Sequence, residues 1–179
     1  MRKLSLNTFL LRSLQALSEN GQTAPRKLSL EAVRNPRLLP PLCLYAAFAM
    51  EPVRRERLIE TSAVMKKEFE RQPILSCSVE GLEKALNDIS DPEDAYYKLW
   101  RSYLSVRDRQ KADDETKLLY HARVTKIQKE KGITNYRIYT DLKLNPGNLN
   151  AWLTHGDCSK LSLDTARRTL RYVQEYTKA

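Results

Sequence analysis

The chain has 179 residues, of which 41% are apolar and 30% are charged, a composition typical of globular proteins that excludes an intrinsically disordered chain. This length suffices for one sizeable domain or two small ones. The net charge of +9 favours a polyanionic partner, either nucleic acid or an anionic membrane surface.

The cysteines and the apolar runs exclude two further classes of protein. Cys43, Cys77 and Cys158 stand at wide, unpatterned spacing, which argues against a disulfide framework and indicates a reducing, cytoplasmic location. No apolar run approaches the roughly 18 residues that a membrane-spanning helix needs. The best candidate, LLPPLCLYAAFAM at 38–50, is too short, so we expect no membrane partner.

The first element is an expected amphipathic helix. Leu6, Leu10, Leu14 and Leu17 recur at helical spacing, with Phe9 beside them. This pattern favours a helix packed on its own domain, and a membrane-surface or targeting helix is the alternative.

Prolines divide the next part of the chain into expected helical segments. One unbroken segment covers 51–72, EPVRRERLIETSAVMKKEFERQ. Another, SVEGLEKALNDIS at 78–90, begins at Ser78 as a plausible N-cap, with Glu80 near the positive end of the helix dipole.

A long helical segment is predicted from Pro92, with Asp91 as its cap. It carries an aromatic and leucine stripe that indicates a protein core or a dimer interface: Tyr96, Leu99, Trp100, Tyr103 and Leu104. The charged stretch 107–115 is either the solvated part of one long helix or a linker. We place the domain boundary here, between a helical domain at 1–110 and a second domain at 111–179, in an all-α protein.

The second domain is predicted to contain four helices. In the first, 114–131, an inward face is expected from Leu118, Leu119, Ala122 and Ile127, and Gly132 is a typical stop. Three more helices are predicted to start at the caps Thr134, Asn145 and Ser162, and Asn145 is followed by Pro146. The apolar faces of the last two helices are Leu149, Trp152 and Leu153, then Leu163, Ala166, Leu170 and Val173.

Two short helices joined by a tight turn, with a supporting helix behind them, indicate a helix-turn-helix. The second helix of that unit places its N-terminal residues against base edges in the major groove of DNA. Its first turn here offers Gly147, Asn148 and Asn150. An Asn amide carries a donor and an acceptor that suit the edge of adenine, and Gly permits close backbone approach.

The stretch ITNYRIYTDLKLNPGNLNAWLTHGD, followed by SLDTARRTL, resembles the lambda-repressor-like (Cro/XRE-type) helix-turn-helix family over about 116–174. The resemblance implies a compact helical DNA-binding domain of a transcriptional regulator that usually binds as a dimer. It implies that Asn135 touches phosphate and braces the recognition helix, and that Pro146, Gly147 and Asn148 face the bases. Two departures are Pro146, where the family often has a long polar base reader, and Tyr139, where it usually has Ala.

Basic residues supply candidate phosphate contacts. Residues 119–179 hold eleven Lys and Arg against five Asp and Glu, so most of the net positive charge lies in this third of the chain. Candidates for phosphate contact, or for simple solvation, are Arg137, Lys143, Lys160, Arg167, Arg168 and Arg171. The full set of predicted DNA-binding residues is Asn135, Arg137, Asn145, Pro146, Gly147, Asn148, Asn150 and Lys160.

The sequence thus predicts a DNA-binding regulator and not an enzyme. No catalytic arrangement is present, and Cys158 near His155 lacks the companions of a metal site, so no cofactor or metal is expected. The expected partners are double-stranded DNA and a second copy of the chain, and the N-terminal domain is a candidate site for a protein partner. The alternative is an antitoxin-like or other protein-interaction module with secondary or no DNA binding.

Overall fold

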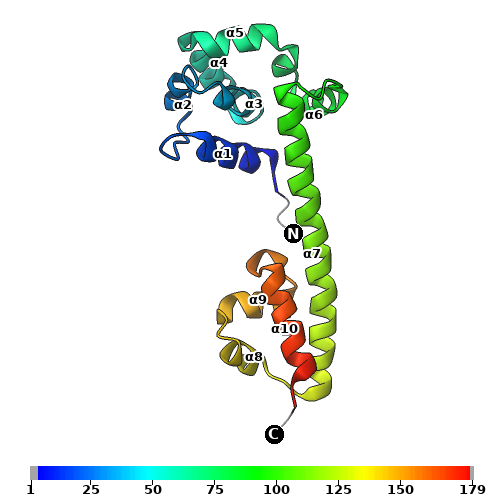
Figure 1. Cartoon of the computed structure of the whole chain (residues 1–179). Coiled ribbons are helices and arrows are strands. Elements are labelled where there is room, and N and C mark those ends of the chain that lie inside the picture. The colour runs from blue at the N-terminus through cyan, green and yellow to red at the C-terminus, as the bar shows by residue number, and fades with distance from the viewer. Residues whose placement is uncertain (1–3, 178–179) are drawn as a thin grey trace. The chain divides into compact units, whose positions relative to one another are not determined.

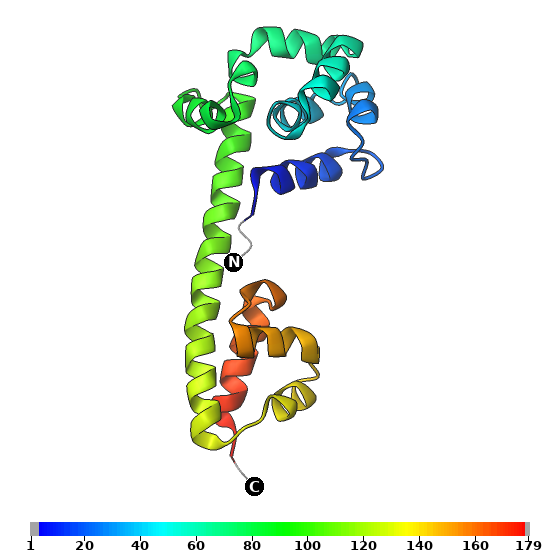
Figure 2. The ribbon, with the colours of Figure 1, turned by 180° about the vertical axis from the view of Figure 1, so that it is seen from behind.

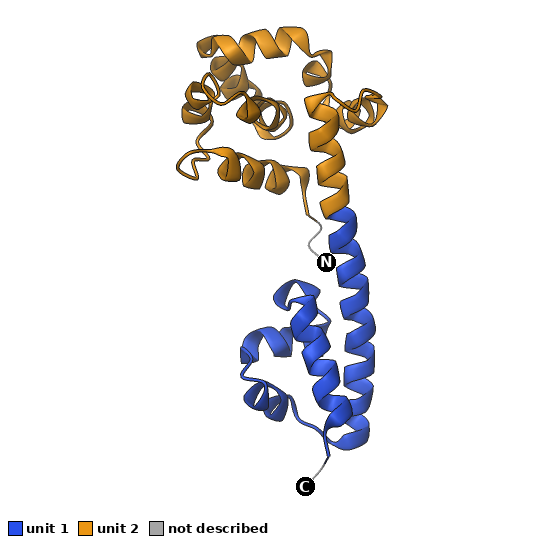
Figure 3. Ribbon diagram, viewed as in Figure 1, with its two compact units in different colours: residues 1–3, 107–179 blue, residues 4–106 orange. Residues whose placement is uncertain are grey.

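A computed structural model describes residues 4–177, and every regular element in that range is a helix, which confirms the all-α prediction (Figure 1). The same elements are seen from behind in Figure 2. The chain divides into two compact units, residues 4–106 and residues 107–177, called here the N-terminal and the C-terminal unit (Figure 3). No helix in the described range is long and apolar enough to cross a membrane.

The N-terminal unit packs short helices around α3 (Leu39–Ala49). Helix α3 is apolar on all sides, and most of its residues are buried, as expected of a central helix. The predicted first helix is present as α1 (Leu6–Leu17), and its leucine stripe packs into this core. The other helices of the unit are α2 (Pro25–Glu31), α4 (Pro52–Thr61), α5 (Ala63–Arg71) and α6 (Val79–Asp88), with 3₁₀ turns at Pro36–Leu38 and Pro73–Ser76.

Two predicted boundaries in this unit have different outcomes. The Ser78 cap is confirmed, because its hydroxyl accepts a hydrogen bond from the Gly81 N–H at 3.2 Å. The expectation of one helix over 51–72 is wrong, because Ser62 leaves the helical conformation (φ −124°, ψ 102°) and separates α4 from α5. The hydroxyl of Thr61 bonds back to the Arg57 carbonyl at 2.8 Å, an interaction common where helices bend or end.

Helix α7 (Ala95–Lys131) is continuous, so 107–115 is the charged part of one long helix and not a linker. Its predicted start at Pro92 is wrong by three residues. Asp94 is the cap, since its carboxylate accepts from the N–H groups of Tyr96 at 2.7 Å and Tyr97 at 3.1 Å, while Asp91 shapes the turn before it. Tyr96, Trp100 and Tyr103 are buried, so the aromatic stripe belongs to the core of the N-terminal unit.

In the C-terminal unit, the end of α7 packs with α8 (Asn135–Asp141), α9 (Pro146–His155) and α10 (Leu163–Glu175). A 3₁₀ turn at Cys158–Lys160 joins α9 to α10. The predicted apolar faces of α9 and α10 form the core, together with Val124 and Ile138.

The inward face predicted for 114–131 is largely wrong. Leu118 and Leu119 are 42% and 65% exposed, and Ala122 is also exposed. The inner face instead carries Lys117, His121 and Val124, which recur at helical spacing. The two polar residues tolerate this position because each bonds to a backbone carbonyl of a later element: Lys117 to Cys158 at 3.1 Å, and His121 to Leu153 at 3.1 Å.

Candidate nucleic-acid interface

Helix α8 begins where Thr134 satisfies a free backbone donor. Its hydroxyl accepts from the Arg137 N–H at 3.2 Å, as the sequence predicts. Gly132, just before it, has a φ of 65° at the end of α7, a left-handed conformation that glycine adopts without steric cost. Ile138 is the buried anchor of α8, and the helix is only seven residues long.

The turn between α8 and α9 is held by backbone hydrogen bonds. The Leu144 N–H donates to the Tyr139 carbonyl at 2.9 Å, and the Leu142 N–H donates to Ile138 at 3.0 Å. Lys143, between them, has a φ of 53°, a left-handed conformation that costs a residue with a Cβ about 1 kcal/mol. The turn therefore sets the direction of α9 at some cost in local strain.

Helix α9 begins and ends at the predicted residues. The side-chain oxygen of Asn145 accepts from the Asn148 N–H at 3.0 Å, with Pro146 as the first helical residue. At the other end Gly156, at φ 67°, donates to the Trp152 carbonyl at 2.8 Å. Both ends of the candidate recognition helix are thus fixed by local bonds.

The two faces of α9 differ sharply in exposure. Leu149 and Trp152 are fully buried and Leu153 is 7% exposed. Five residues at the start of the helix are exposed: Asn145, Pro146, Gly147, Asn148 and Asn150. The structure therefore places these five predicted site residues together at the exposed N-terminal end of α9.

A relay of three side-chain amides links α7, α8 and α9. Gln128 donates to the side-chain oxygen of Asn135 at 2.9 Å, and Asn135 donates to the side-chain oxygen of Asn150 at 3.1 Å. Asn135 therefore ties α8 to α9, and the resemblance implies a bracing contact at this position. Gln128 is absent from the sequence-based set, because the only local signal for it is its place in the last turn of α7.

Arg137 is exposed but is already engaged within the unit. Its Nε donates to Asp141 at 2.9 Å, and the Tyr172 hydroxyl donates to the same carboxylate at 2.7 Å. The pKa of Arg137 is raised, first by a hydrogen bond with Tyr172 and then by the charge of Asp141. Burial and the bond to Asp141 raise the pKa of Tyr172. A phosphate would therefore compete with Asp141 for this guanidinium.

The other basic residues predicted as candidates for phosphate contact differ in the contacts they make within the unit. Lys160 is exposed after α9, next to Asp157, whose pKa is lowered chiefly by hydrogen bonds from Ser159. Arg168 donates to the Leu142 carbonyl at 3.5 Å, a long bond at the end of α8. Arg167 and Arg171 are exposed on α10 with no acidic partner among the described residues.

The C-terminal end of α9 is supported by His121. Its Nε2 lies 3.1 Å from the Leu153 carbonyl, and its ring packs edge-on against Trp152 with centroids 5.6 Å apart. His155, the last residue of α9, is exposed, whereas Cys158 is buried. Within residues 4–177 no three His, Cys, Asp or Glu side chains lie close enough together to hold a metal ion.

Comparison with known proteins finds no matching family model, no matching curated protein and no matching solved structure. The resemblance to lambda-repressor-like proteins therefore stays a prediction.

Proposed function

We propose that the C-terminal unit binds double-stranded DNA by inserting the first turn of α9 into the major groove, and that the protein is a sequence-specific transcriptional regulator. The observation that carries this proposal is the division of α9 into a buried apolar face and an exposed first turn rich in small and amide residues. Helix α8 and the relay through Asn135 hold that turn in place. A base-reading helix requires this combination of a fixed rod and an accessible tip.

Asn148 is the side chain best suited to read a base. It is exposed, and its amide group has no hydrogen-bond partner among the described residues. An Asn amide can pair with the N6 and N7 atoms of adenine in a bidentate fashion. Pro146 and Gly147 have small side chains or none, so the helix tip can approach the base edges closely.

The charge of the unit supports the same partner. Residues 119–179 have a net charge of +6, and Lys160, Arg167 and Arg171 are exposed. Neutralising phosphates with such side chains releases counterions and makes binding depend on salt.

The exposed part of α7 supports self-association. Leu119 is 65% exposed and Leu118 is 42% exposed, and Ala122 lies one turn further along the same helix. We assign the homodimer contact to this stripe. A two-fold dimer would place two recognition helices about 34 Å apart and would favour a nearly palindromic operator.

The competing candidate, a protein-interaction module, is favoured by the same exposed apolar residues and by Tyr136 on α8, which is 65% exposed. In that case DNA would bind weakly or without sequence preference. The two functions differ in whether one DNA sequence is preferred over competitor DNA.

The test is selection of bound sequences from a random duplex library, followed by fluorescence anisotropy on the selected site and on an unrelated duplex. Asn148→Ala is expected to weaken the selected site by about 1–3 kcal/mol, or roughly fivefold to 150-fold, with little change on the unrelated duplex. Lys160→Gln should weaken both duplexes alike and reduce the slope of log K against log salt by about one unit.

Asn20→Ala is the matched control, because Asn20 is exposed in the N-terminal unit and distant in sequence from α9.

Asn135→Ala distinguishes a residue that positions α9 from one that contacts DNA. It should weaken the selected site, and the loss should largely disappear when Asn150 is already Ala, because the two amides bond to each other. Equal weakening of both duplexes by Asn148→Ala, or selection of no preferred sequence, would refute the proposal.

A further inference from the structure

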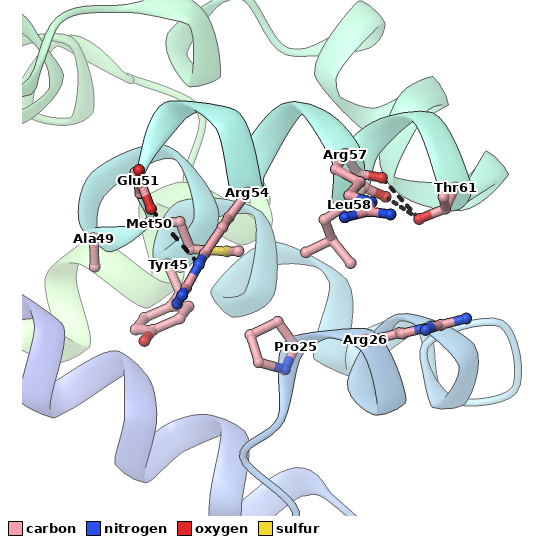
Figure 4. A pocket seen from close by; sticks show the side chains of 10 residues that line it. All are labelled: Pro25, Arg26, Tyr45, Ala49, Met50, Glu51, Arg54, Arg57, Leu58 and Thr61. Atoms are coloured by element: carbon pink, nitrogen blue, oxygen red, sulfur yellow. Dashed lines mark hydrogen bonds and ion pairs between the residues drawn. The ribbon is translucent and has the colours of Figure 1, made fainter.

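The N-terminal unit contains an open cavity of about 820 Å³ between α2, the end of α3 and α4 (Figure 4). This volume lies within the roughly 300–1,000 Å³ typical of small-molecule sites. All of its lining residues belong to this one unit.

Three arginines line this cavity. Arg26 comes from α2, and Arg54 and Arg57 come from α4, where a spacing of three residues places them on the same side of the helix (Figure 4). The only acidic lining residue is Glu51, which lies 3.6 Å from Arg54. Arg26 and Arg57 have no acidic partner within residues 4–177, so the cavity keeps an excess of positive charge.

The rest of the lining is mainly apolar. Tyr45 on α3 and Met50, which directly follows α3, are half-buried, and Leu58 on α4 is buried. Pro25, the first residue of α2, also lines the cavity. These surfaces suit the body of an organic ligand, since ligand sites are mostly apolar with a few fixed polar groups.

We propose that this cavity binds a small amphipathic anion, an aromatic or aliphatic molecule that carries a phosphate or a carboxylate. The guanidinium groups of Arg26 and Arg57 hold the oxyanion, because the planar fork of Arg matches the two oxygens of such a group. Tyr45, Met50 and Leu58 cover the apolar body. A DNA duplex does not fit, because it is too wide to enter the cavity and reach these apolar residues.

The test uses 1-naphthyl phosphate as the probe, with 1-naphthoate as the carboxylate counterpart. Titration of the ¹⁵N-labelled full chain is expected to shift amide signals of residues around Met50 and Arg57, with a dissociation constant of about 0.1 mM, as expected for a ligand of this size. Isothermal titration calorimetry of the full chain with each of the two probes measures the dissociation constants independently. 1-Naphthol and inorganic phosphate each lack one half of the required chemistry and should bind at least about tenfold more weakly.

The variant is Arg26→Gln combined with Arg57→Gln, and its matched control is Arg12→Gln combined with Arg101→Gln, two exposed arginines outside the cavity. The cavity variant should bind 1-naphthyl phosphate about tenfold more weakly or worse, and the control should bind it unchanged. All four arginines are exposed, so both variants should keep the native circular-dichroism spectrum. The proposal is overturned by no saturable binding at millimolar probe, by equal binding of 1-naphthol or of inorganic phosphate, or by equal losses in the two variants.

Discussion

Replacing Asp114 with alanine tests how a buried ion pair stabilises the C-terminal unit. The Asp114 carboxylate lies 3.0 Å from the Lys117 ammonium, and the two side chains are only 10% and 12% exposed. Lys117 also donates to the carbonyl of Cys158 at 3.1 Å, so the pair ties α7 to the turn that follows the candidate recognition helix.

The magnitude follows from what the substitution leaves behind. Without Asp114, the Lys117 ammonium keeps one carbonyl partner in a site that excludes most water. Removing one member of a buried pair costs about 3–5 kcal/mol, and the long stem of Lys lets the ammonium reach toward water, so we expect about 3 kcal/mol. Glu130→Ala is the matched control on the same helix, since the Lys126–Glu130 pair is 77% and 58% exposed with a distance of 3.9 Å. It should cost at most about 0.5 kcal/mol.

The assay is urea unfolding of the full chain in a Trp100→Phe background. The chain has two tryptophans, so the remaining fluorescence comes from Trp152 in the core of the C-terminal unit. Asp114→Leu combined with Lys117→Met removes both charges and should recover most of the loss, because apolar residues of similar volume often replace buried pairs without cost. A loss from Asp114→Ala no larger than that from Glu130→Ala would show that the pair is hydrated and would refute the reasoning.

Two further predictions concern the turn before α9 and the cysteines. Lys143→Gly should raise the free energy of unfolding in the same assay by about 0.5–1 kcal/mol, because φ is 53° at this residue, whereas Lys143→Ala should give no gain. In native buffer a thiol reagent should modify the exposed Cys77 rapidly and the buried Cys43 and Cys158 slowly, since burial and then the charge of Glu68 raise the pKa of Cys43 to about 12. Cys43 and Cys158 should become reactive at the urea concentrations at which the N-terminal and the C-terminal unit, respectively, unfold. Rapid modification of all three cysteines in native buffer would contradict the expected protection of Cys43 and Cys158.

In the C-terminal unit, the helix starts at three caps and the two glycine stops are the features that the sequence predicts most accurately. The caps at Thr134, Asn145 and Ser162 all form hydrogen bonds to a backbone N–H three residues later. The glycines that end α7 and α9 have the left-handed conformation that their positions favour. Such features depend on neighbours within a few residues, so a local pattern contains the information they need.

The inward face of α7 was predicted wrongly because its determinants are distant in sequence. Leucine identity favoured Leu118 and Leu119, but the face against α9 is occupied by Lys117 and His121. Their partners are carbonyl groups 41 and 32 residues away, which no local periodicity reveals. The arginine-lined cavity escaped prediction for the same reason, because α2 and α4 meet only in the fold.

The concentration of asparagines around α9 has two physical causes that the structure separates. Residues 135–150 contain four asparagines. Asn145 uses its side-chain oxygen to cap α9, and Asn135 and Asn150 bond to each other, so folding accounts for three of these four. Asn148 contributes only its backbone N–H to these bonds, and its amide faces solvent. Because folding gives no reason for an amide there, substitution of Asn148 should leave stability nearly unchanged. A large effect of Asn148→Ala on one DNA sequence would then report recognition directly, whereas the same loss in Asn135→Ala would include the cost of a displaced helix.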